Sequence, residues 1–155
     1  MRVACASDAH RSYEKEERLI ALLPRVDVFC FLRDVDDDAD CLEALLKEKQ
    51  PHALFFAVAG NNDPFSPRAR TLTVPFGPVR AMLTHGHLFR SQEAMAAFAG
   101  KQGCRLVLFG HTHKPLHEIM NGVYVVNPGA LRSGQWALME MEAMGNAPDV
   151  RLMAL

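Results

Sequence analysis

Two histidines one residue apart follow an apolar run in the segment VLFGHTHKP. Leu106–Phe109 has the length and composition of a buried strand, Gly110 allows a turn, and Pro115 prevents simple continuation of the strand. His111 and His113 are therefore expected at the carboxyl end of a strand. Ligands bind at that end in open α/β sheets, so the pair marks a candidate site.

Other side chains that can bind metals also follow apolar runs. The seven candidates mix imidazole with carboxylate and amide oxygens: Asp8, His10, Asp34, Asn61, His85, His111 and His113. Thiolates are absent from this set, which argues against a cysteine-rich structural zinc site and favours manganese, iron, zinc or similar ions. Seven ligands are too many for one tetrahedral site and suit two ions about 3.5–4 Å apart. Such a pair, set against only two aspartates, would attract phosphate and generate hydroxide at neutral pH.

The elements that must position these ligands alternate in the first part of the chain. Residues 2–7, 27–32 and 53–59 are apolar runs of strand length, and residues 11–24 and 39–49 have helical patterns between them. This order predicts a parallel sheet covered by helices. Because the carboxyl ends of parallel strands lie along one edge, we expect the candidate ligands to meet there.

Each of the two helical segments has a predicted buried or solvated face. In the first, four apolar residues are expected toward the core: Leu19, Ile20, Leu22 and Leu23. An acidic run precedes and enters the second: Asp36, Asp37, Asp38 and Asp40. Carboxylates favour the first turn of a helix, so this run is interpreted as a solvated helix start rather than a further metal site.

The pattern changes to hairpins in the second half of the chain. Residues 71–85 hold two strand-like runs around a turn at residues 75–78, and a helix is expected from Ser91 to Gly103. Asn121-Gly122 between extended runs predicts a two-residue hairpin turn. The last two strand-like runs are 135–142 and 149–155.

Composition limits the function classes. The chain has 155 residues, 49% of them hydrophobic, which suits a single domain over residues 1–155. A net charge of −1 gives no general case for nucleic acid or membrane binding. The four cysteines lack C-x-x-C spacing and are expected to be buried free thiols, and the first residues are neither a secretory signal nor a membrane span. A cytoplasmic location is therefore predicted.

Five motifs carry a family resemblance. SDAH, FLRD, GNND, THGH and GHTH, in this order and spacing, resemble those of the calcineurin-like metallophosphoesterases. The GNND and NPGA segments are similar to those of the small bacterial and archaeal phosphodiesterases of that superfamily. The resemblance spans residues 4–130 and implies a four-layer α/β/β/α fold, with two packed mixed β-sheets flanked by helices.

The resemblance also implies how the ligands divide between two divalent ions. Asp8, His10 and His113 would hold the first ion, Asp34 would bridge, and Asn61, His85 and His111 would hold the second. The expected metal is Mn²⁺, with Fe, Zn or Ni as alternatives. Members of the family hydrolyse phosphoesters by in-line attack of a metal-activated hydroxide, so the same reaction is expected here.

Two further residues are candidate catalytic groups. Larger relatives place a histidine two residues after the asparagine of the GN motif, where this chain has Asp63, which would act as a general acid. His87 either orients a ligand or touches phosphate, or it is an ordinary polar loop residue. These interpretations of His87 are left open.

Two arginines depart from the family pattern. Arg11 and Arg33 occupy positions where the family usually has glycine, so each is expected to avoid positive φ or to point into the cleft. There they would bind substrate phosphate together with Asn61. The alternative for Arg33 is a surface ion pair with the acidic run at residues 36–38.

The sequence therefore predicts a dinuclear metal-dependent hydrolase of small phosphoesters, with phosphodiesters as the expected substrates. The sequence leaves three properties open: the preference for monoesters or diesters, the native metal, and whether the protein forms a homo-oligomer. One alternative is a non-catalytic protein-interaction scaffold of the same fold, which a eukaryotic retromer subunit resembles. Another is a nuclease acting on DNA or RNA ends, although the near-neutral charge gives no obvious groove for a polymer.

Overall fold

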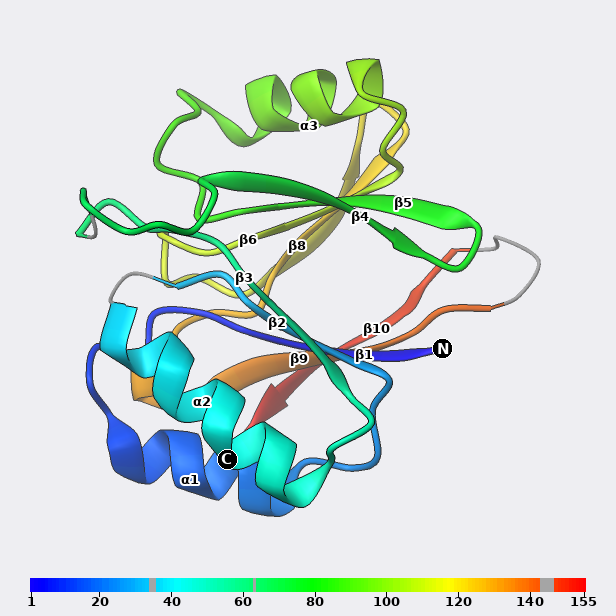
Figure 1. Ribbon diagram of the computed structural model, residues 1–155. Coiled ribbons are helices and arrows are strands. Elements are labelled where there is room, and N and C mark those ends of the chain that lie inside the picture. The colour runs from blue at the N-terminus through cyan, green and yellow to red at the C-terminus, as the bar shows by residue number, and fades with distance from the viewer. Residues whose placement is uncertain (34–35, 63, 143–146) are drawn as a thin grey trace.

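The computed structural model of the protein describes residues 1–33, 36–62, 64–142 and 147–155. Two five-stranded mixed sheets pack face to face, and helices cover their outer faces (Figure 1). This arrangement confirms the expected four-layer α/β/β/α fold.

The first sheet has the strand order β10-β9-β1-β2-β3. Its strands are β1 (Arg2–Ala6), β2 (Val28–Phe31), β3 (Leu54–Ala57), β9 (Gln135–Glu140) and β10 (Asp149–Ala154). The strands β1, β2 and β3 are parallel, as the alternating sequence pattern predicts, and β9 and β10 add antiparallel neighbours. Helices α1 (Tyr13–Leu22) and α2 (Asp36–Lys49) cover the outer face (Figure 1).

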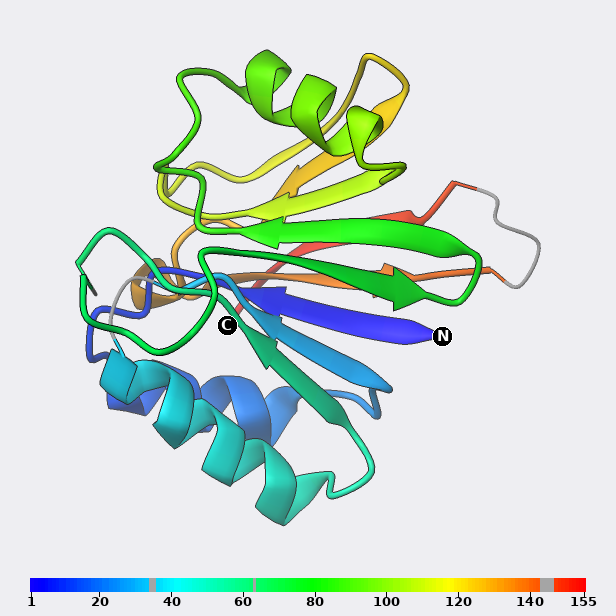
Figure 2. The ribbon, with the colours of Figure 1, turned by 45° about the horizontal axis from the view of Figure 1, so that its top comes forward.

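The second sheet has the order β4-β5-β6-β8-β7. Its strands are β4 (Thr71–Phe76), β5 (Val79–Thr84), β6 (Leu106–Phe109), β7 (Leu116–Met120) and β8 (Val123–Asn127). Helix α3 (Gln92–Lys101) covers its outer face (Figure 2). A short 3₁₀ helix, η1 (Leu131–Ser133), lies between β8 and β9 in the chain.

The core divides into layers because side chains alternate along each strand. On β1, Val3 and Cys5 belong to the cluster between the two sheets, whereas Ala4 and Ala6 belong to the cluster under α1 and α2. Both faces of β1 are therefore buried, which explains its uninterrupted apolar sequence. Cys5 and two other cysteines, Cys30 and Cys104, are buried free thiols, and Cys41 is partly buried.

Local sequence signals account for several boundaries. The Ser91 hydroxyl accepts a hydrogen bond from the Ala94 backbone N–H and caps α3. Asn121 and Gly122 have φ values of 52° and 75°, as a two-residue hairpin turn requires. Pro75 lies inside β4 rather than in the turn, and this is tolerated because β4 is at the edge of its sheet.

The buried face of α1 differs from the expectation. Leu22 is 59% exposed, so its assignment to the core is wrong. The buried stripe of α1 instead consists of Glu16, Leu19 and Ile20 at the spacing i, i+3, i+4, and Leu23, the residue after the helix, is also buried. Leu22 falls outside that stripe.

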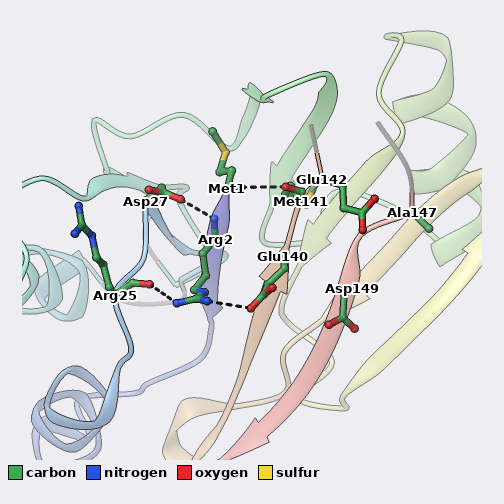
Figure 3. A pocket seen from close by; sticks show the side chains of 9 residues that line it. All are labelled: Met1, Arg2, Arg25, Asp27, Glu140, Met141, Glu142, Ala147 and Asp149. Atoms are coloured by element: carbon green, nitrogen blue, oxygen red, sulfur yellow. Dashed lines mark hydrogen bonds and ion pairs between the residues drawn. The ribbon is translucent and has the colours of Figure 1, made fainter. Parts of the chain in front are cut away.

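The two ends of the sheets are built differently. The parallel strands β1, β5 and β6 all have their carboxyl ends at the left in Figure 2, where the motif loops emerge. At the other end, beside the start of β1 and the neighbouring ends of β9 and β10, lies a cavity of about 440 Å³ (Figure 3). None of the helices in the described part of the chain is both long and apolar enough to cross a bilayer.

Candidate metal centre

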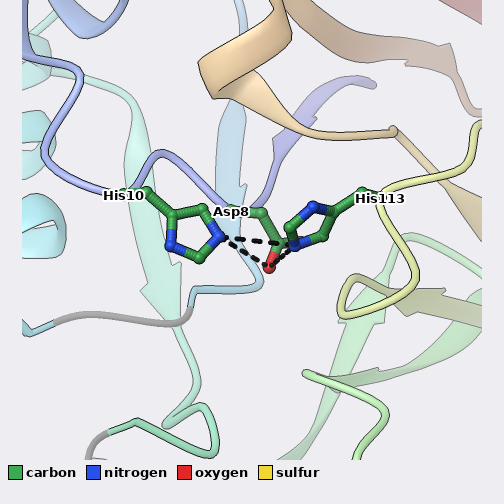
Figure 4. Close-up of side chains that lie close together, drawn as sticks. All are labelled: Asp8, His10 and His113. Atoms are coloured by element: carbon green, nitrogen blue, oxygen red, sulfur yellow. Dashed lines mark hydrogen bonds and ion pairs between the residues drawn. The ribbon is translucent and has the colours of Figure 1, made fainter.

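Three side chains converge at the carboxyl end of β1. Asp8 Oδ1 lies 3.2 Å from His113 Nε2 and 3.9 Å from His10 Nε2, and the two imidazole nitrogens are 3.3 Å apart (Figure 4). Each of the three residues offers a ligand atom within 4.8 Å of the others. They are the three residues that the resemblance implies for the first ion.

The Asp8 carboxylate is held by one oxygen only. Its Oδ2 atom accepts hydrogen bonds from the Ser7 hydroxyl at 2.6 Å and from the His111 backbone N–H at 3.0 Å. Its Oδ1 atom is buried and accepts no hydrogen bond from the described residues. Because an unsatisfied buried carboxylate oxygen is costly, the arrangement fits a cation at Oδ1.

Left-handed backbone conformations concentrate at this centre. Four candidate ligands and one neighbour have positive φ: Asp8 (54°), His10 (51°), Arg11 (61°), His111 (66°) and His113 (59°). Among the described non-glycine residues, the only other such value is that of Asn121 in its hairpin turn. For a non-glycine residue, the left-handed conformation costs about 1–2 kcal/mol relative to the right-handed helical conformation. Strain of this kind persists where it serves a site, and here it turns the ligand side chains toward one another.

A buried aspartate holds the first of these turns. Both oxygens of Asp38 accept from the Arg11 backbone N–H, at 3.0 and 3.1 Å. Asp38 is fully buried, so its interpretation as part of a solvated helix start is wrong. Burial raises the pKa of Asp38, and the hydrogen bond from Arg11 opposes that rise. The sequence analysis missed this role, and no signal in the acidic run distinguishes Asp38 from its neighbours.

The turn of the GHTH motif is held in a second way. Asn127 Nδ2 donates to the Gly110 carbonyl oxygen at 2.8 Å and to Thr112 Oγ1 at 3.1 Å. A Cβ atom on Gly110 would lie 1.8 Å from Ser7 Oγ. Glycine is therefore required here, because the turn passes directly over the residues that fix Asp8.

A second cluster adjoins the first. His85 is fully buried, its Nδ1 lies 2.8 Å from the Leu32 carbonyl oxygen, and its Nε2 lies 2.9 Å from Asn61 Oδ1. A carbonyl oxygen only accepts, so Nδ1 donates to Leu32 and Nε2 is directed at Asn61 Oδ1. An imidazole nitrogen beside an amide oxygen is a pair of groups that can bind a metal ion. His85 Nε2 is also 4.0 Å from Asp8 Oδ1, which places the two clusters side by side.

The structure brings the remaining histidine candidates to the same place. The ring of His111 lies 5.1 Å from that of His85, and the ring of His87 lies 5.5 Å from His85 and 6.3 Å from His111. His87 is therefore close enough to influence the centre. Asp34 and Asp63, the predicted bridge and general acid, lie outside the described residues.

The two arginines have different surroundings. Arg33 is fully buried and donates to Ser66 Oγ at 3.1 Å, which contradicts a surface ion pair for it. Arg11 is 66% exposed at its side chain and lies 3.9 Å from an oxygen of Asp37. Its φ of 61° contradicts the expectation that an arginine here avoids positive φ. The hydrogen bonds to Asp38 supply the reason, since they stabilise the left-handed backbone directly.

Comparison with known proteins agrees with this geometry. The family model of the calcineurin-like phosphoesterase superfamily domain matches residues 1–144. The chain belongs to this superfamily. It is 27% identical over 135 residues to the probable metallophosphoesterase YsnB of Bacillus subtilis, covering 85% of this chain and 76% of that protein. The family implies the use of divalent metals, and the cluster around Asp8 provides a place for one.

Solved structures share the fold over nearly the whole chain. A predicted phosphoesterase from Streptococcus pneumoniae has a TM-score of 0.79 at 20% identity, covering 99% of this chain and 88% of that one. A structure described as a novel archaeal phosphodiesterase has a TM-score of 0.75 at 20% identity, covering 100% of both chains. Vps29 from Entamoeba histolytica, solved with Zn²⁺, has a TM-score of 0.72 at 20% identity, covering 99% of both. At these identities the likeness concerns the fold alone.

Proposed function

We propose that this metallophosphoesterase hydrolyses phosphodiesters of small molecules with two divalent ions. The observation that carries the proposal is the buried Asp8 Oδ1 atom, which accepts no hydrogen bond from the described residues and faces His10, His85 and His113. A structural role would leave this oxygen satisfied by protein donors. The Asp8 carboxylate is fixed through Oδ2, and its Oδ1 atom faces imidazole nitrogens. These are the surroundings expected of a metal ligand.

The described residues would divide between two ions. Asp8, His10 and His113 would hold the first ion, and Asn61, His85 and His111 would hold the second. Asp34 is proposed to bridge them on the strength of its motif. Imidazole together with oxygen donors suits Mn²⁺, with Fe, Zn or Ni as alternatives. When bound, a pair of such ions supplies a hydroxide nucleophile at neutral pH and neutralises charge on the phosphate.

The protein's own groups orient the centre. The Leu32 carbonyl oxygen fixes the His85 ring by accepting from Nδ1, so Nε2 faces Asn61. The Ser7 hydroxyl fixes Asp8 by donating a hydrogen bond to its Oδ2 atom. Asp63 is proposed to protonate the departing ester oxygen, a role that matters for poor alkoxide leaving groups and little for nitrophenolate. His87 is proposed to touch phosphate or to orient a ligand from its place beside His85 and His111.

Diester hydrolysis is favoured by the GNND motif and by the likeness to a structure described as a phosphodiesterase. The alternative of a non-catalytic scaffold draws on the likeness to Vps29. The six described ligand residues are all present here, and this supports catalysis over scaffolding. The proposed substrate is a small phosphoester, and neither nucleic acid nor a membrane is proposed as a partner. The proposed location is the cytoplasm.

The test is hydrolysis by metal-stripped protein to which Mn²⁺, Ni²⁺, Zn²⁺ or Mg²⁺ is restored separately. Bis(p-nitrophenyl) phosphate and p-nitrophenyl phosphate serve as the diester and the monoester. We expect turnover of the diester with at least one metal and its loss in His113→Ala. The matched control is His117→Ala, an exposed histidine on β7, which should keep full activity.

No turnover with any metal would contradict the proposal and favour the scaffold. Metal content by mass spectrometry separates the two further, because a dinuclear enzyme binds two ions per chain. Equal loss of activity in His113→Ala and His117→Ala would show that the effect is not specific to the centre.

A further inference from the structure

A second cavity adjoins the metal centre. It has a volume of about 330 Å³ and lies between the start of α3 and the loops that follow β5 and β6. His111 lines it, together with Gly86 and Thr112. Since His111 also lies ring to ring with His85 at 5.1 Å, this candidate ligand connects the cavity to the centre.

The inner wall of the cavity is apolar and fixed. Phe109 and Met95 line it and are each only 2% exposed, so both are part of the core under α3. Phe89 adds a partly buried ring, whose centroid lies 5.6 Å from that of Phe98. An ideal Cβ on Gly86 would meet the Phe109 ring at 3.2 Å, so the loop backbone packs directly on this wall. The wall therefore exists before any ligand binds.

The rim of the cavity is polar and electrically balanced. Arg90 and Glu93 are exposed residues of opposite charge that line it, and Ser91 is occupied in capping α3. A balanced rim gives no preference for a second anionic group. An apolar wall of two phenylalanines and a methionine instead favours an uncharged ring, because aromatic and thioether groups pack well against a π-face.

Size agrees with this chemistry. A volume of about 330 Å³ lies at the lower end of the range for small-molecule sites, about 300–1,000 Å³. It accommodates an aromatic group of one or two rings and is too small for a polymer segment.

We propose that this cavity binds an aromatic ester group of the substrate while the phosphate lies at the metal centre. The inference rests on the proposed function for the position of the phosphate. It names the substrate class as aryl or nucleoside phosphodiesters rather than esters of small aliphatic alcohols.

The test compares the binding of phenyl phosphate and methyl phosphate to the Mn²⁺-loaded protein by calorimetry. Both carry the same phosphate group, and each represents a product that keeps one ester group. We expect phenyl phosphate to bind about tenfold more tightly or better, in keeping with the burial of a ring. The same ratio is expected between their inhibition constants against diester hydrolysis.

Filling the cavity should remove the preference for phenyl phosphate over methyl phosphate. Gln92→Trp places a large side chain at a half-buried lining position, and we expect the preference for phenyl phosphate to fall to near one. The matched control is Ala97→Trp, an exposed position on the same helix that does not line the cavity, which should keep the wild-type ratio. If Gln92→Trp does not fold, Phe89→Ala removes part of the wall and should reduce the ratio.

The outcomes separate the two proposals. Equal binding of the two phosphates by wild-type protein, or an unchanged ratio in Gln92→Trp, would overturn the cavity assignment even if diesters are hydrolysed. A preference for phenyl phosphate that Gln92→Trp removes would support the cavity even if no metal restores hydrolysis.

Discussion

The two ends of the sheets differ in how their polar groups are satisfied. At the amino end, around the cavity of about 440 Å³, Arg2 pairs with Glu140 at 3.2 Å, and the Arg2 backbone N–H donates to Asp27 at 2.7 Å. At the carboxyl end, a buried oxygen of Asp8 accepts no hydrogen bond from the described residues, and five described residues have left-handed backbones. None of the residues that line the amino-end cavity has positive φ.

This difference shows that volume is a poor guide to chemistry. The amino-end cavity is larger, yet Arg2 on its wall is already paired with Glu140 and Asp27 (Figure 3). The carboxyl end keeps strain and an unsatisfied carboxylate that a metal-free protein would not need. The following changes test whether that contrast reflects function.

The largest effect is expected from Asp8→Asn. The change removes a charged ligand, so diesterase activity should fall by more than about 100-fold, since loss of supporting groups alone costs about 10–100-fold in metal affinity or activity. In metal-free protein the same change should instead stabilise the fold. An amide can still accept from Ser7 and His111, and removing an uncompensated buried charge should raise the free energy of unfolding by about 1–3 kcal/mol.

Urea unfolding in the presence of a chelator measures the stability of Asp8→Asn, and initial rates with restored metal measure its activity. Asp27→Asn at the amino end is the control and should keep wild-type activity. A less stable metal-free Asp8→Asn would contradict the interpretation of Oδ1.

The next effect is expected from Asp38→Ala. Loss of both acceptors for the Arg11 N–H frees the turn that carries His10, so metal affinity should fall about 10–100-fold, as for other groups that orient a ligand. Adding Arg11→Gly should restore part of the loss, because glycine adopts positive φ without the cost of about 1–2 kcal/mol.

Metal titration of the single and double variants measures this coupling. Asp37→Ala is the control, since Asp37 is exposed and contacts only the Arg11 side chain among the interactions described for it. If Arg11→Gly gives no recovery in the Asp38→Ala background, Asp38 acts through something other than the turn.

A smaller effect is expected from the pH dependence of stability. Burial raises the pKa of Glu16 from 4.5 to about 7, and the neighbouring Asp38 carboxylate adds to the rise. The folded state therefore binds more protons than the unfolded state between these values. The contribution of Glu16 to stability is fully present below about pH 4.5 and is lost as pH rises to about 7.

Glu16→Gln should remove this dependence. The ratio of unfolding equilibrium constants of wild type and Glu16→Gln should change on the order of tenfold or more across that window, measured by urea unfolding with a chelator present. Glu14→Gln, an exposed position on the same helix, should track the wild type. A ratio that is constant with pH would show that folding does not raise the pKa of Glu16.

The smallest effect is expected at the amino end. Glu140→Gln breaks an ion pair whose side chains are 42% and 43% exposed, so the free energy of unfolding should change by less than about 1 kcal/mol. Activity should not change. A loss of activity here would erase the contrast between the two ends of the sheets.

The sequence by itself determined the order of the elements and the place where the candidate ligands meet. Apolar runs of strand length predict β1, β2 and β6 because strands buried on both faces need no polar alternation. The run at β3 is predicted by the same pattern, although this edge strand is only partly buried. Metal-capable residues directly after those runs predict a shared edge, since parallel strands end on the same side. The Asn121-Gly122 turn can likewise be predicted from the sequence, because positive φ at both residues is a local requirement.

Only the tertiary structure decided which polar groups are buried. Asp38 and Asp37 are neighbours in one acidic run, yet the first is fully buried beneath Arg11 and the second is exposed. Leu22 has the composition of a core residue and lies outside. The left-handed φ of Arg11 cannot be predicted from the sequence either, because the Arg11 N–H donates to the Asp38 carboxylate, 27 positions away in the chain. Burial and strain depend on what packs against a residue, and that is fixed only when the chain is folded.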